Sequence, residues 1–277
     1  MKFIPVKQAS GEDLNLYYED LGQGSPVILI HGWPLDHQMW DYQVKALVDA
    51  GFRVISYDRR GFGKSDKPAT GYDYNTLTDD LKAVIDHLQL DNFALVGFSM
   101  AGGEVVRYFS KHGGRGATKA ALISSIAPYM LQTDDNPEGV PQETINGIAE
   151  NIQKERAGFL GDFVKQFYGV GVLSNPVSRQ QLDSDITIGM QATLISTLGC
   201  AVAFSSTDLR SEMSAVTVPT LIIHGDNDQT VPIRATGEQA ARMISGAEYI
   251  VYEGEPHGLF LTSKDRLNED LVRFLKS

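Results

Sequence analysis

The feature that most limits what this chain can fold into is a serine placed between a strand and a helix. The apolar run Phe93–Val96 leads into the sequence GFSMAGG at residues 97–103, and a helical pattern begins at Glu104. A serine at such a sharp turn, flanked by small residues, sits on a strained elbow that holds its hydroxyl clear of the backbone above a sheet. The pattern predicts a strand, turn and helix unit, and it makes Ser99 a candidate nucleophile.

A serine hydroxyl attacks poorly by itself, so the chain must also supply a base and an acid. Candidates for both follow apolar runs late in the chain, in the sequences HGDND (224–228) and EPHG (255–258). The order serine, aspartate, histidine is expected when the nucleophile follows a central strand and its partners lie on loops after the last two strands of an open parallel sheet. His257 is the candidate base, and Asp226 and Asp228 compete as the acid.

Strand and helix patterns alternate along much of the chain. Residues 13–19 alternate polar and apolar as an edge strand does, whereas 26–30 form a continuous apolar run typical of a buried parallel strand. Further strands are predicted over 52–57 and 119–123, with helices over 77–88, 104–112 and 264–276. This alternation predicts an α/β fold in which helices flank a mostly parallel central sheet.

The alternation stops near Pro128, and the stretch that follows lacks a clear strand. Apolar residues recur in it at helical spacing, namely Ile145, Ile148 and Ile152, then Phe159, Phe163 and Phe167. Strands resume near Val218. The sequence therefore predicts a core formed by residues 1–127 and 214–277, with residues 128–213 inserted as a helical cap.

Composition limits the size, the partners and the compartment. With 277 residues, 42% of them hydrophobic, the chain can form one large α/β domain with an insertion. The net charge of -11 opposes binding to nucleic acid phosphates or to an anionic membrane surface. No run approaches the ~20 apolar residues of a membrane span and no signal-peptide pattern begins the chain, so we expect a cytoplasmic protein with no membrane partner. Cys200 is the only cysteine, which excludes an intramolecular disulfide, and it is expected to be buried in the cap.

Several short motifs together indicate a family. The chain carries HGWP at 31–34, DRRG at 58–61, GFSM at 97–100, GGEVVRY at 102–108, and HGD and EPHG in the two late loops. With these motifs the chain, from near residue 10 to its end, resembles the α/β-hydrolases, and within them the cofactor-free haloperoxidase, perhydrolase and arylesterase branch. The resemblance implies an α/β-hydrolase fold, no cofactor, and a serine hydrolase that cleaves small aryl or alkyl carboxylic esters through an acyl-enzyme.

The resemblance also assigns roles to the candidate residues. Ser99 would attack the acyl carbonyl, and His257 would act as its base. Asp228 would orient His257, because the acid of the family is the second aspartate of a Gly-Asp-x-Asp pattern. Asp226, the first aspartate, would cap the loop through backbone hydrogen bonds.

Two backbone N–H groups are expected to stabilise the oxyanion of the tetrahedral intermediate. One belongs to Met100, directly after the nucleophile, and the other to Trp33, in the turn after the strand at 26–30. Trp33, with Phe163 and Val231, is also expected to line the substrate pocket. A core position for Trp33 and a packing role for the phenylalanine stripe stay open as alternatives.

Pro34 bears on the choice of acyl acceptor. In the resembled family a proline at this position accompanies members that accept hydrogen peroxide as well as water, although a simple turn proline is an equal alternative. A peracid made in this way would oxidise halide away from the enzyme, so haloperoxidase activity would need no metal. The six histidines show no ligand spacing and predict no metal site, and His37, His87 and His112 are expected to be solvated or capping.

Ala101 departs from the pattern of the family, which has glycine two residues after the nucleophile. Alanine is the smallest step away from glycine and suits the start of a helix better. We expect a functional elbow with altered packing. The alternative is a displaced Met100 N–H and a lower activity.

Other functions are compatible with these residues. A lactonase or an amidase of the lactamase type would use the same serine, and a ligand-binding receptor would keep the triad but turn over very slowly. Dehalogenases and epoxide hydrolases of this fold use a carboxylate nucleophile, which Ser99 argues against. The expected partners are a small-molecule ester and either water or hydrogen peroxide, and an apolar patch on the cap would allow a homo-oligomer.

Overall fold

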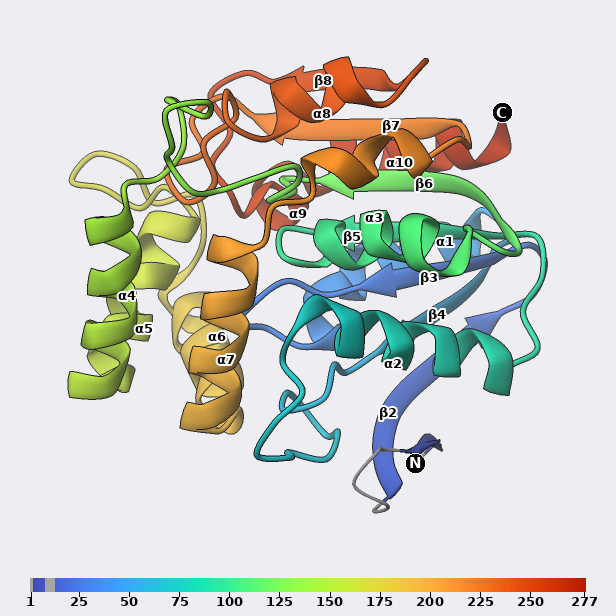
Figure 1. The fold of residues 1–277 in the computed structure, drawn as a ribbon, viewed down its shortest axis with the longest axis horizontal. Helices are drawn as coiled ribbons and strands as arrows, with labels where there is room; N and C mark the ends of the chain where they lie inside the picture. Colours follow the sequence, from blue (N-terminus) through green and yellow to red (C-terminus); the bar gives the residue numbers. More distant parts are fainter. Residues whose placement is uncertain (1, 8–12) are drawn as a thin grey trace.

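An eight-stranded sheet forms the centre of the molecule (Figure 1). The computed structural model describes residues 2–7 and 13–277. The strands are β1 (Lys2–Lys7), β2 (Asp13–Gly22), β3 (Pro26–Ile30), β4 (Arg53–Tyr57), β5 (Phe93–Phe98), β6 (Ala117–Ile123), β7 (Thr220–Gly225) and β8 (Glu248–Tyr252). Their order is β1-β2-β4-β3-β5-β6-β7-β8, with antiparallel pairing at β1-β2 and β2-β4 and parallel pairing elsewhere. The predicted α/β fold class is confirmed.

The inner strands are apolar because both faces of the sheet are covered. Every residue of β5 and of β7 is buried. Along β3, Val27 and Leu29 belong to one hydrophobic cluster, whereas Ile28 and Ile30 belong to the other. Successive side chains of a strand point to opposite faces, so these two clusters are the two cores on either side of the sheet.

The strand predicted over 13–19 is not at the edge of the sheet. β2 pairs with β4 on one side, and β1, which was not predicted, pairs with it on the other. Leu14 and Leu16 are buried while Asp13 and Asn15 are exposed. Such alternation shows that one face of a strand is covered, but it says nothing about pairing at the strand's side. The edge prediction was wrong for this reason.

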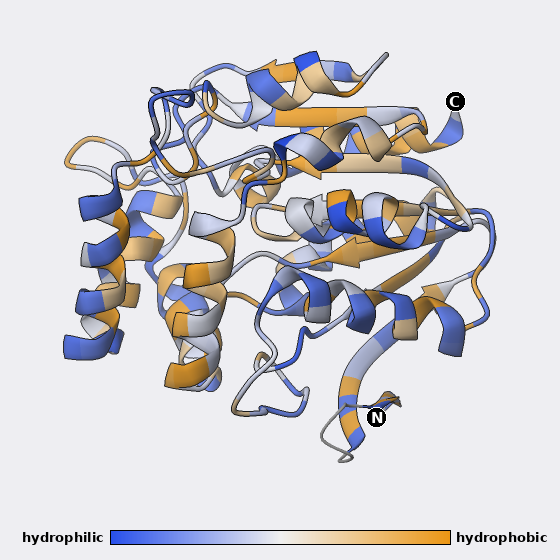
Figure 2. Cartoon of the chain, viewed as in Figure 1, coloured by the Kyte–Doolittle hydropathy of each residue, from blue (hydrophilic) through white to orange (hydrophobic). Residues whose placement is uncertain are grey.

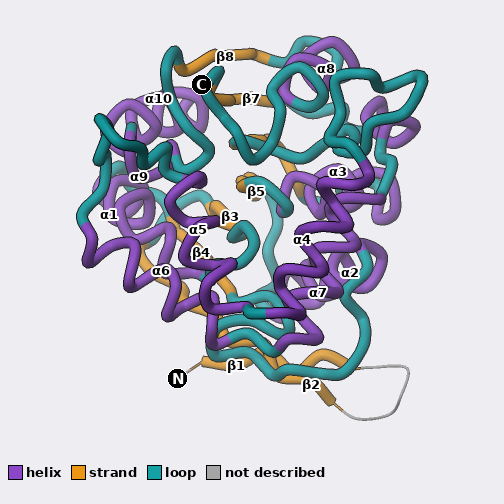
Figure 3. Tube along the Cα trace, turned by 90° about the vertical axis from the view of Figure 1, so that its left-hand side faces the viewer, coloured by secondary structure: helices purple, strands orange, loops and turns teal. Residues whose placement is uncertain are grey.

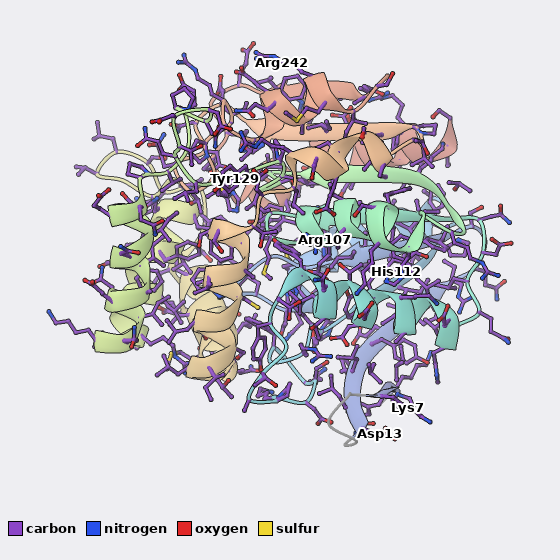
Figure 4. All side chains as sticks on the ribbon, viewed as in Figure 1. Lys7, Asp13, Arg107, His112, Tyr129 and Arg242 are labelled. Atoms are coloured by element: carbon purple, nitrogen blue, oxygen red, sulfur yellow. The ribbon has the colours of Figure 1, made fainter. Side chains whose placement is uncertain are left out.

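Helices cover both faces of the sheet. The core helices are η1 (His37–Trp40), α1 (Asp41–Asp49), α2 (Tyr74–His87), α3 (Ala101–His112), η2 (Arg210–Ala215), α8 (Gly237–Met243), α9 (Leu259–Thr262) and α10 (Lys264–Lys276). α1 packs against α10 on one face, and α2 packs against α3 on the other. Arg107 of α3, labelled in Figure 4, forms an ion pair with Glu212 of η2 at 2.6 Å. The helices predicted over 77–88, 104–112 and 264–276 are confirmed.

Four α-helices, besides η2, occupy the connection between β6 and β7. They are α4 (Gln142–Lys154), α5 (Arg156–Phe167), α6 (Arg179–Gln191) and α7 (Leu194–Ser206). Figure 1 places them together at the end of the sheet where the parallel strands finish. α5 packs against α6, and α4 packs against α7. In Figure 2, α4 is hydrophilic on its outer side and hydrophobic on the side that faces its neighbours. The helical spacing of the isoleucines and phenylalanines is thus confirmed.

Helix α7 is unusual in carrying no charged residue. Cys200 lies on its buried side, as predicted, and burial raises the pKa of the thiol to about 12.

Within residues 2–7 and 13–277, no single helix has the length and apolar character needed to cross a membrane. α6 and α7 meet that criterion only as a pair, and they are bent by 99° relative to each other.

Candidate active site

Ser99 lies on a strained turn between β5 and α3. Its φ of 54° falls in the left-handed region, which residues with a side chain rarely adopt. The Ser99 N–H donates to the Ile123 carbonyl at 2.8 Å, and the Ser99 carbonyl accepts from the Gly102 N–H at 3.0 Å. A Cβ atom at Gly102 would lie 1.9 Å from Ser125 Oγ, so only glycine fits there. The turn is held by hydrogen bonds on both sides and by close packing behind it.

Ala101 is the first residue of α3 and is fully buried. The close approach of strand and helix depends on Gly97 instead, where a Cβ atom would lie 2.8 Å from the Ala101 carbonyl oxygen. The methyl group of Ala101 is therefore accommodated, because the contact between strand and helix is made at Gly97, four residues earlier in β5.

His257 connects Ser99 to Asp228. His257 Nε2 lies 2.9 Å from Ser99 Oγ, and His257 Nδ1 lies 2.6 Å from Asp228 Oδ2. A carboxylate can only accept, so the ring proton sits on Nδ1 and leaves Nε2 free to accept from the serine hydroxyl. All three side chains are buried, with 6% of Ser99 exposed. The loops after β5, β7 and β8 thus bring the three predicted residues together.

Both oxygens of the Asp228 carboxylate are held by hydrogen bonds. Oδ1 accepts from the N–H groups of Thr230 and Val231 at 2.8 and 2.7 Å, and Oδ2 lies 3.1 Å from His224 Nε2 as well as next to His257. Burial raises the pKa of this carboxyl, but electrostatic attraction to His257 and the hydrogen bonds from both histidines outweigh it and hold the pKa well below its usual range. Asp228 is therefore ionised.

Asp226 lies elsewhere. It is exposed, and its Oδ1 accepts a hydrogen bond from the Gly254 N–H at 2.6 Å, which ties the β7 loop to the turn after β8. Of the two competing aspartates, the structure brings Asp228 to His257.

The Trp33 and Met100 N–H groups, predicted as oxyanion donors, have no protein acceptor within the described residues. The turn that contains Trp33 lies against the elbow, because a Cβ atom at Gly32 would be 3.3 Å from Ser99 Cβ. The Gly32 carbonyl faces away from it, accepting from His31 Nδ1 at 2.9 Å and from Leu35 N at 3.1 Å. Because the Trp33 N–H belongs to the same planar peptide as the Gly32 carbonyl, fixing one fixes the other.

A buried ionic network supports this turn. Arg59 Nε donates to Glu104 Oε1 at 2.8 Å, and its terminal nitrogen donates to the His31 carbonyl at 2.7 Å. The Arg59 N–H also donates to His31 Nε2 at 2.9 Å, which leaves His31 Nδ1 as the protonated nitrogen. Burial and the charge of Arg59 lower the pKa of His31 to about 3, so this ring is neutral. The network links the Trp33 turn to α3, which begins directly after Met100.

A cavity of about 630 Å³ opens onto Ser99. Trp33, Phe163 and Val231 all line it, as does Phe159 of the same phenylalanine stripe, which was also weighed as a channel residue. Phe204 lines it too and was not singled out. Figure 3 looks between α4 and α5 towards the end of β5, and residues of both helices line this cavity. About half of the lining residues are aromatic or aliphatic, which suits an apolar portion of a ligand.

For Trp33 and for the phenylalanine stripe, the sequence left open whether the side chains line the pocket or pack in the core. Trp33 lines the cavity but is only 3% exposed, and its Nε1 donates to the Thr197 carbonyl at 3.1 Å, so it belongs to both wall and core. Phe163 lines the cavity, whereas Phe167 is buried and its ring centre lies 4.9 Å from that of His257. One helical stripe therefore serves both the cavity and the packing around His257.

Three contacts around the site were not predicted: His224 on Asp228, the Arg59–Glu104 pair behind the Trp33 turn, and Tyr168, which packs beside Phe167. The charged residues of the DRRG and GGEVVRY motifs were a usable signal for the pair. A buried arginine requires a buried carboxylate partner.

Asp36, His37 and Asp58 form the one group in the described part of the chain whose atoms could act jointly as metal ligands, with all three atoms within 4.8 Å. Hydrogen bonds already occupy these carboxylates: Asp58 accepts from the N–H groups of His37 and Lys64, and Asp36 accepts from Gln38. His37 Nδ1 lies 2.6 Å from Asp58 Oδ1. His37 was predicted to be solvated or capping; it is only 4% exposed, so the solvated alternative is wrong.

Comparisons with known proteins agree with this architecture. A model of the α/β hydrolase fold family matches residues 25–264, and the chain belongs to that family. A non-heme chloroperoxidase of Kitasatospora aureofaciens is 40% identical over 95% of this chain and 97% of its own, and a bifunctional esterase/perhydrolase of Acinetobacter calcoaceticus is 35% identical over 96% and 98%. The crystal structure of a bromoperoxidase from Bacillus anthracis superposes with a TM-score of 0.95 at 42% identity and covers 100% of both chains. The predicted family is confirmed.

Proposed function

We propose that this chain is a serine esterase that cleaves small aryl or alkyl carboxylic esters through an acyl-enzyme. The observation that carries the proposal is the hydrogen-bonded series from Ser99 Oγ through His257 to Asp228, with distances of 2.9 and 2.6 Å. The esterase/perhydrolase relative supports the same reaction class.

In the first half-reaction, Ser99 Oγ bonds to the acyl carbon while its proton passes to His257 Nε2. Asp228 keeps the ring in the required tautomer and stabilises the imidazolium that forms. The Trp33 and Met100 N–H groups donate to the oxyanion, and losing one such donor costs ~10²- to 10³-fold in rate. His257 then gives its proton to the leaving alcohol, and Ser99 is left acylated.

In the second half-reaction, water attacks the acyl-enzyme. Its proton passes to His257 and then to Ser99 Oγ as the carboxylic acid leaves. Hydrogen peroxide can take the place of water with the same proton transfers, and the product is then a peracid. Pro34 beside Trp33 and the perhydrolase relative support this second acceptor.

Residues 128–213 act in this proposal as a cap over the reaction centre. Trp33, Phe163 and Val231 line the cavity together with Ser99 and would hold the apolar part of the ester. Charged lining residues such as Lys154 and Asp162 are exposed, which favours a neutral ester within the cavity.

The test is hydrolysis of 4-nitrophenyl acetate in metal-free buffer by the purified protein and by Ser99→Ala, Asp228→Asn and Asp226→Asn. Ser99→Ala is expected to lower kcat about 10⁶-fold and Asp228→Asn about 10⁴-fold. Asp226→Asn is the matched control, because it removes the other carboxylate of the same loop, and it should retain kcat within about threefold.

Hydrolysis that survives in Ser99→Ala would exclude the proposal. A wild-type protein that binds esters but does not turn them over would favour the receptor alternative. Adding hydrogen peroxide and a halide to the active protein tests perhydrolysis: halogenation should require an ester or carboxylic acid and should disappear in Ser99→Ala.

A further inference from the structure

His224, the fifth residue of β7, has a contact that its place in the strand does not require. Its Nε2 atom lies 3.1 Å from Asp228 Oδ2 and 3.0 Å from the Val231 carbonyl oxygen. A carbonyl can only accept, so Nε2 carries the ring proton and shares it between the two oxygens. The side chain is fully buried. His224 therefore donates a hydrogen bond to the same carboxylate oxygen that holds His257.

The Asp228 carboxylate consequently has little freedom to rotate. Oδ2 receives the two histidines, His257 at 2.6 Å and His224 at 3.1 Å. Oδ1 receives the N–H groups of Thr230 and Val231 at 2.8 and 2.7 Å. The backbone donors fix one oxygen, but the second could still tilt away from His257. His224 is the remaining group that keeps Oδ2 in line.

The second nitrogen of the His224 ring, Nδ1, has an unfavourable environment. Nδ1 is buried and has no hydrogen-bond partner among the described residues. A Cβ atom at Gly237 would lie only 2.7 Å from Nδ1, so the ring packs directly on the backbone of α8. An unpaired buried nitrogen costs stability, and an apolar side chain of similar size would avoid that cost. Such a local conflict is expected where a residue serves a site.

We propose that His224 is a positioning residue for the reaction: its Nε2–H holds Asp228 Oδ2 at the point where it orients the His257 ring. His224 has no contact with Ser99 and does not transfer a proton. This inference rests on the proposed function, because Asp228 needs exact orientation only if His257 accepts the serine proton. The same N–H also fixes the carbonyl of Val231, a residue of the cavity wall.

The test compares His224→Leu with His224→Gln. Leucine removes the donor and keeps an apolar volume, whereas the glutamine amide can place an N–H where Nε2 stands. Because a hydrogen bond to a charged group contributes more than a neutral one, we expect His224→Leu to lower kcat for 4-nitrophenyl acetate about 10- to 100-fold with KM within about twofold. His224→Gln should recover at least a third of the wild-type kcat.

Thr220→Val is the matched control. Thr220 is buried at the start of the same strand, its hydroxyl donates to the Val218 carbonyl at 2.8 Å, and it does not touch Asp228. Losing the hydrogen bond of the Thr220 hydroxyl tests whether the loss of any hydrogen bond in β7 lowers kcat. We expect the kcat of Thr220→Val to be within about twofold of the wild type. Should His224→Leu fail to fold, His224→Asn takes its place, since the shorter amide overlies Nδ1 and does not reach Asp228.

The inference is overturned if a folded His224→Leu keeps a kcat equal to that of Thr220→Val. It is also overturned if His224→Leu changes KM but not kcat, or if His224→Leu and His224→Gln lower kcat equally. Ser99→Ala is measured in the same series. Activity that survives in Ser99→Ala contradicts the proposed function itself, whereas activity that depends on Ser99 but not on His224 contradicts only the positioning role.

Discussion

The reaction centre at the strand ends and the helices α4 and α5 are built in opposite ways. Around Ser99 the polar side chains are buried and most of their polar atoms are paired, as in the four hydrogen bonds to Asp228. In α4 and α5 the residues that face the cavity are mostly half-buried or exposed, and their side-chain hydrogen bonds are largely local. Proton transfer requires fixed distances, whereas holding an apolar group requires only surface. The cavity-facing residues of these helices can therefore change substrate preference while the distances for proton transfer stay fixed.

The largest effect is expected from the Arg59–Glu104 pair, both members of which are fully buried. Glu104→Gln leaves the Arg59 charge without a charged partner, and breaking a buried pair in this way costs about 3–5 kcal/mol. Because a domain is stable by only about 5–15 kcal/mol, at least about a fifth of the protein's free energy of unfolding would be lost. Urea unfolding measures the change, and esterase activity should fall with it because the Trp33 turn loses its support.

Glu238→Gln is the control for this prediction. Glu238 pairs with Arg242 at 3.3 Å on the surface, and losing an exposed pair changes the free energy of unfolding by at most about 1 kcal/mol. If Glu104→Gln is no more destabilising than Glu238→Gln, the buried pair does not support the reaction centre.

A second prediction concerns Asp185, a buried residue of α6. Asp185 accepts from the Tyr168 hydroxyl at 2.6 Å and from Gln181 Nε2 at 3.0 Å, and burial raises its pKa to about 6. Between its ordinary pKa and pH 6 the folded protein binds more protons than the unfolded chain, so stability falls as the pH rises through this window. Asp185→Asn removes this fall and should stabilise the protein by on the order of 2 kcal/mol at pH 8.

Thermal unfolding of both proteins at pH 5 and pH 8 gives the measurement for Asp185→Asn. The melting temperature of Asp185→Asn should exceed that of the wild type by more at pH 8 than at pH 5. An equal difference at both pH values would mean that the carboxyl does not titrate in this window. Activity against 4-nitrophenyl acetate should persist, because Asp185 touches neither Ser99 nor His257.

The same contrast explains what could be predicted from the sequence. The elbow and the late loops lie in local motifs, so Ser99, Asp228 and His257 could be named, and the structure brings them together. β1 was missed because a strand of six residues in which only Ile4 and Val6 are buried has no long apolar pattern. His37 was misjudged because its burial depends on Asp58, which lies 21 positions away.

The phenylalanine stripe shows a second limit. Helical spacing places Phe159, Phe163 and Phe167 on related faces of one helix, but it does not say what lies opposite each of them. Phe163 meets the cavity, while one turn later Phe167 meets the rings of His257 and Phe98. Only the tertiary arrangement separates the two roles, because neighbouring turns of α5 face different parts of the core.

These two phenylalanines give the third prediction. Phe163→Ala enlarges the cavity, so kcat/KM for 4-nitrophenyl acetate should fall about tenfold while bulkier acyl groups gain relative to acetate. Phe167→Ala removes a side chain packed on His257 and should destabilise the protein by about 3–5 kcal/mol. A panel of 4-nitrophenyl esters and urea unfolding test both. An unchanged acyl preference in Phe163→Ala would show that this side chain does not shape the substrate pocket.

The smallest effect is expected at Ala101. Since the close approach of β5 and α3 depends on Gly97, the methyl group of Ala101 is not what sets the position of the Met100 N–H. Ala101→Gly, which restores the pattern of the family, should therefore leave kcat within about twofold. It should also destabilise α3 by about 0.5–1 kcal/mol, because glycine is a poorer helix former than alanine. Steady-state kinetics and urea unfolding distinguish this from the alternative: a clear rise in kcat would mean that the methyl group displaces the Met100 N–H and limits the reaction.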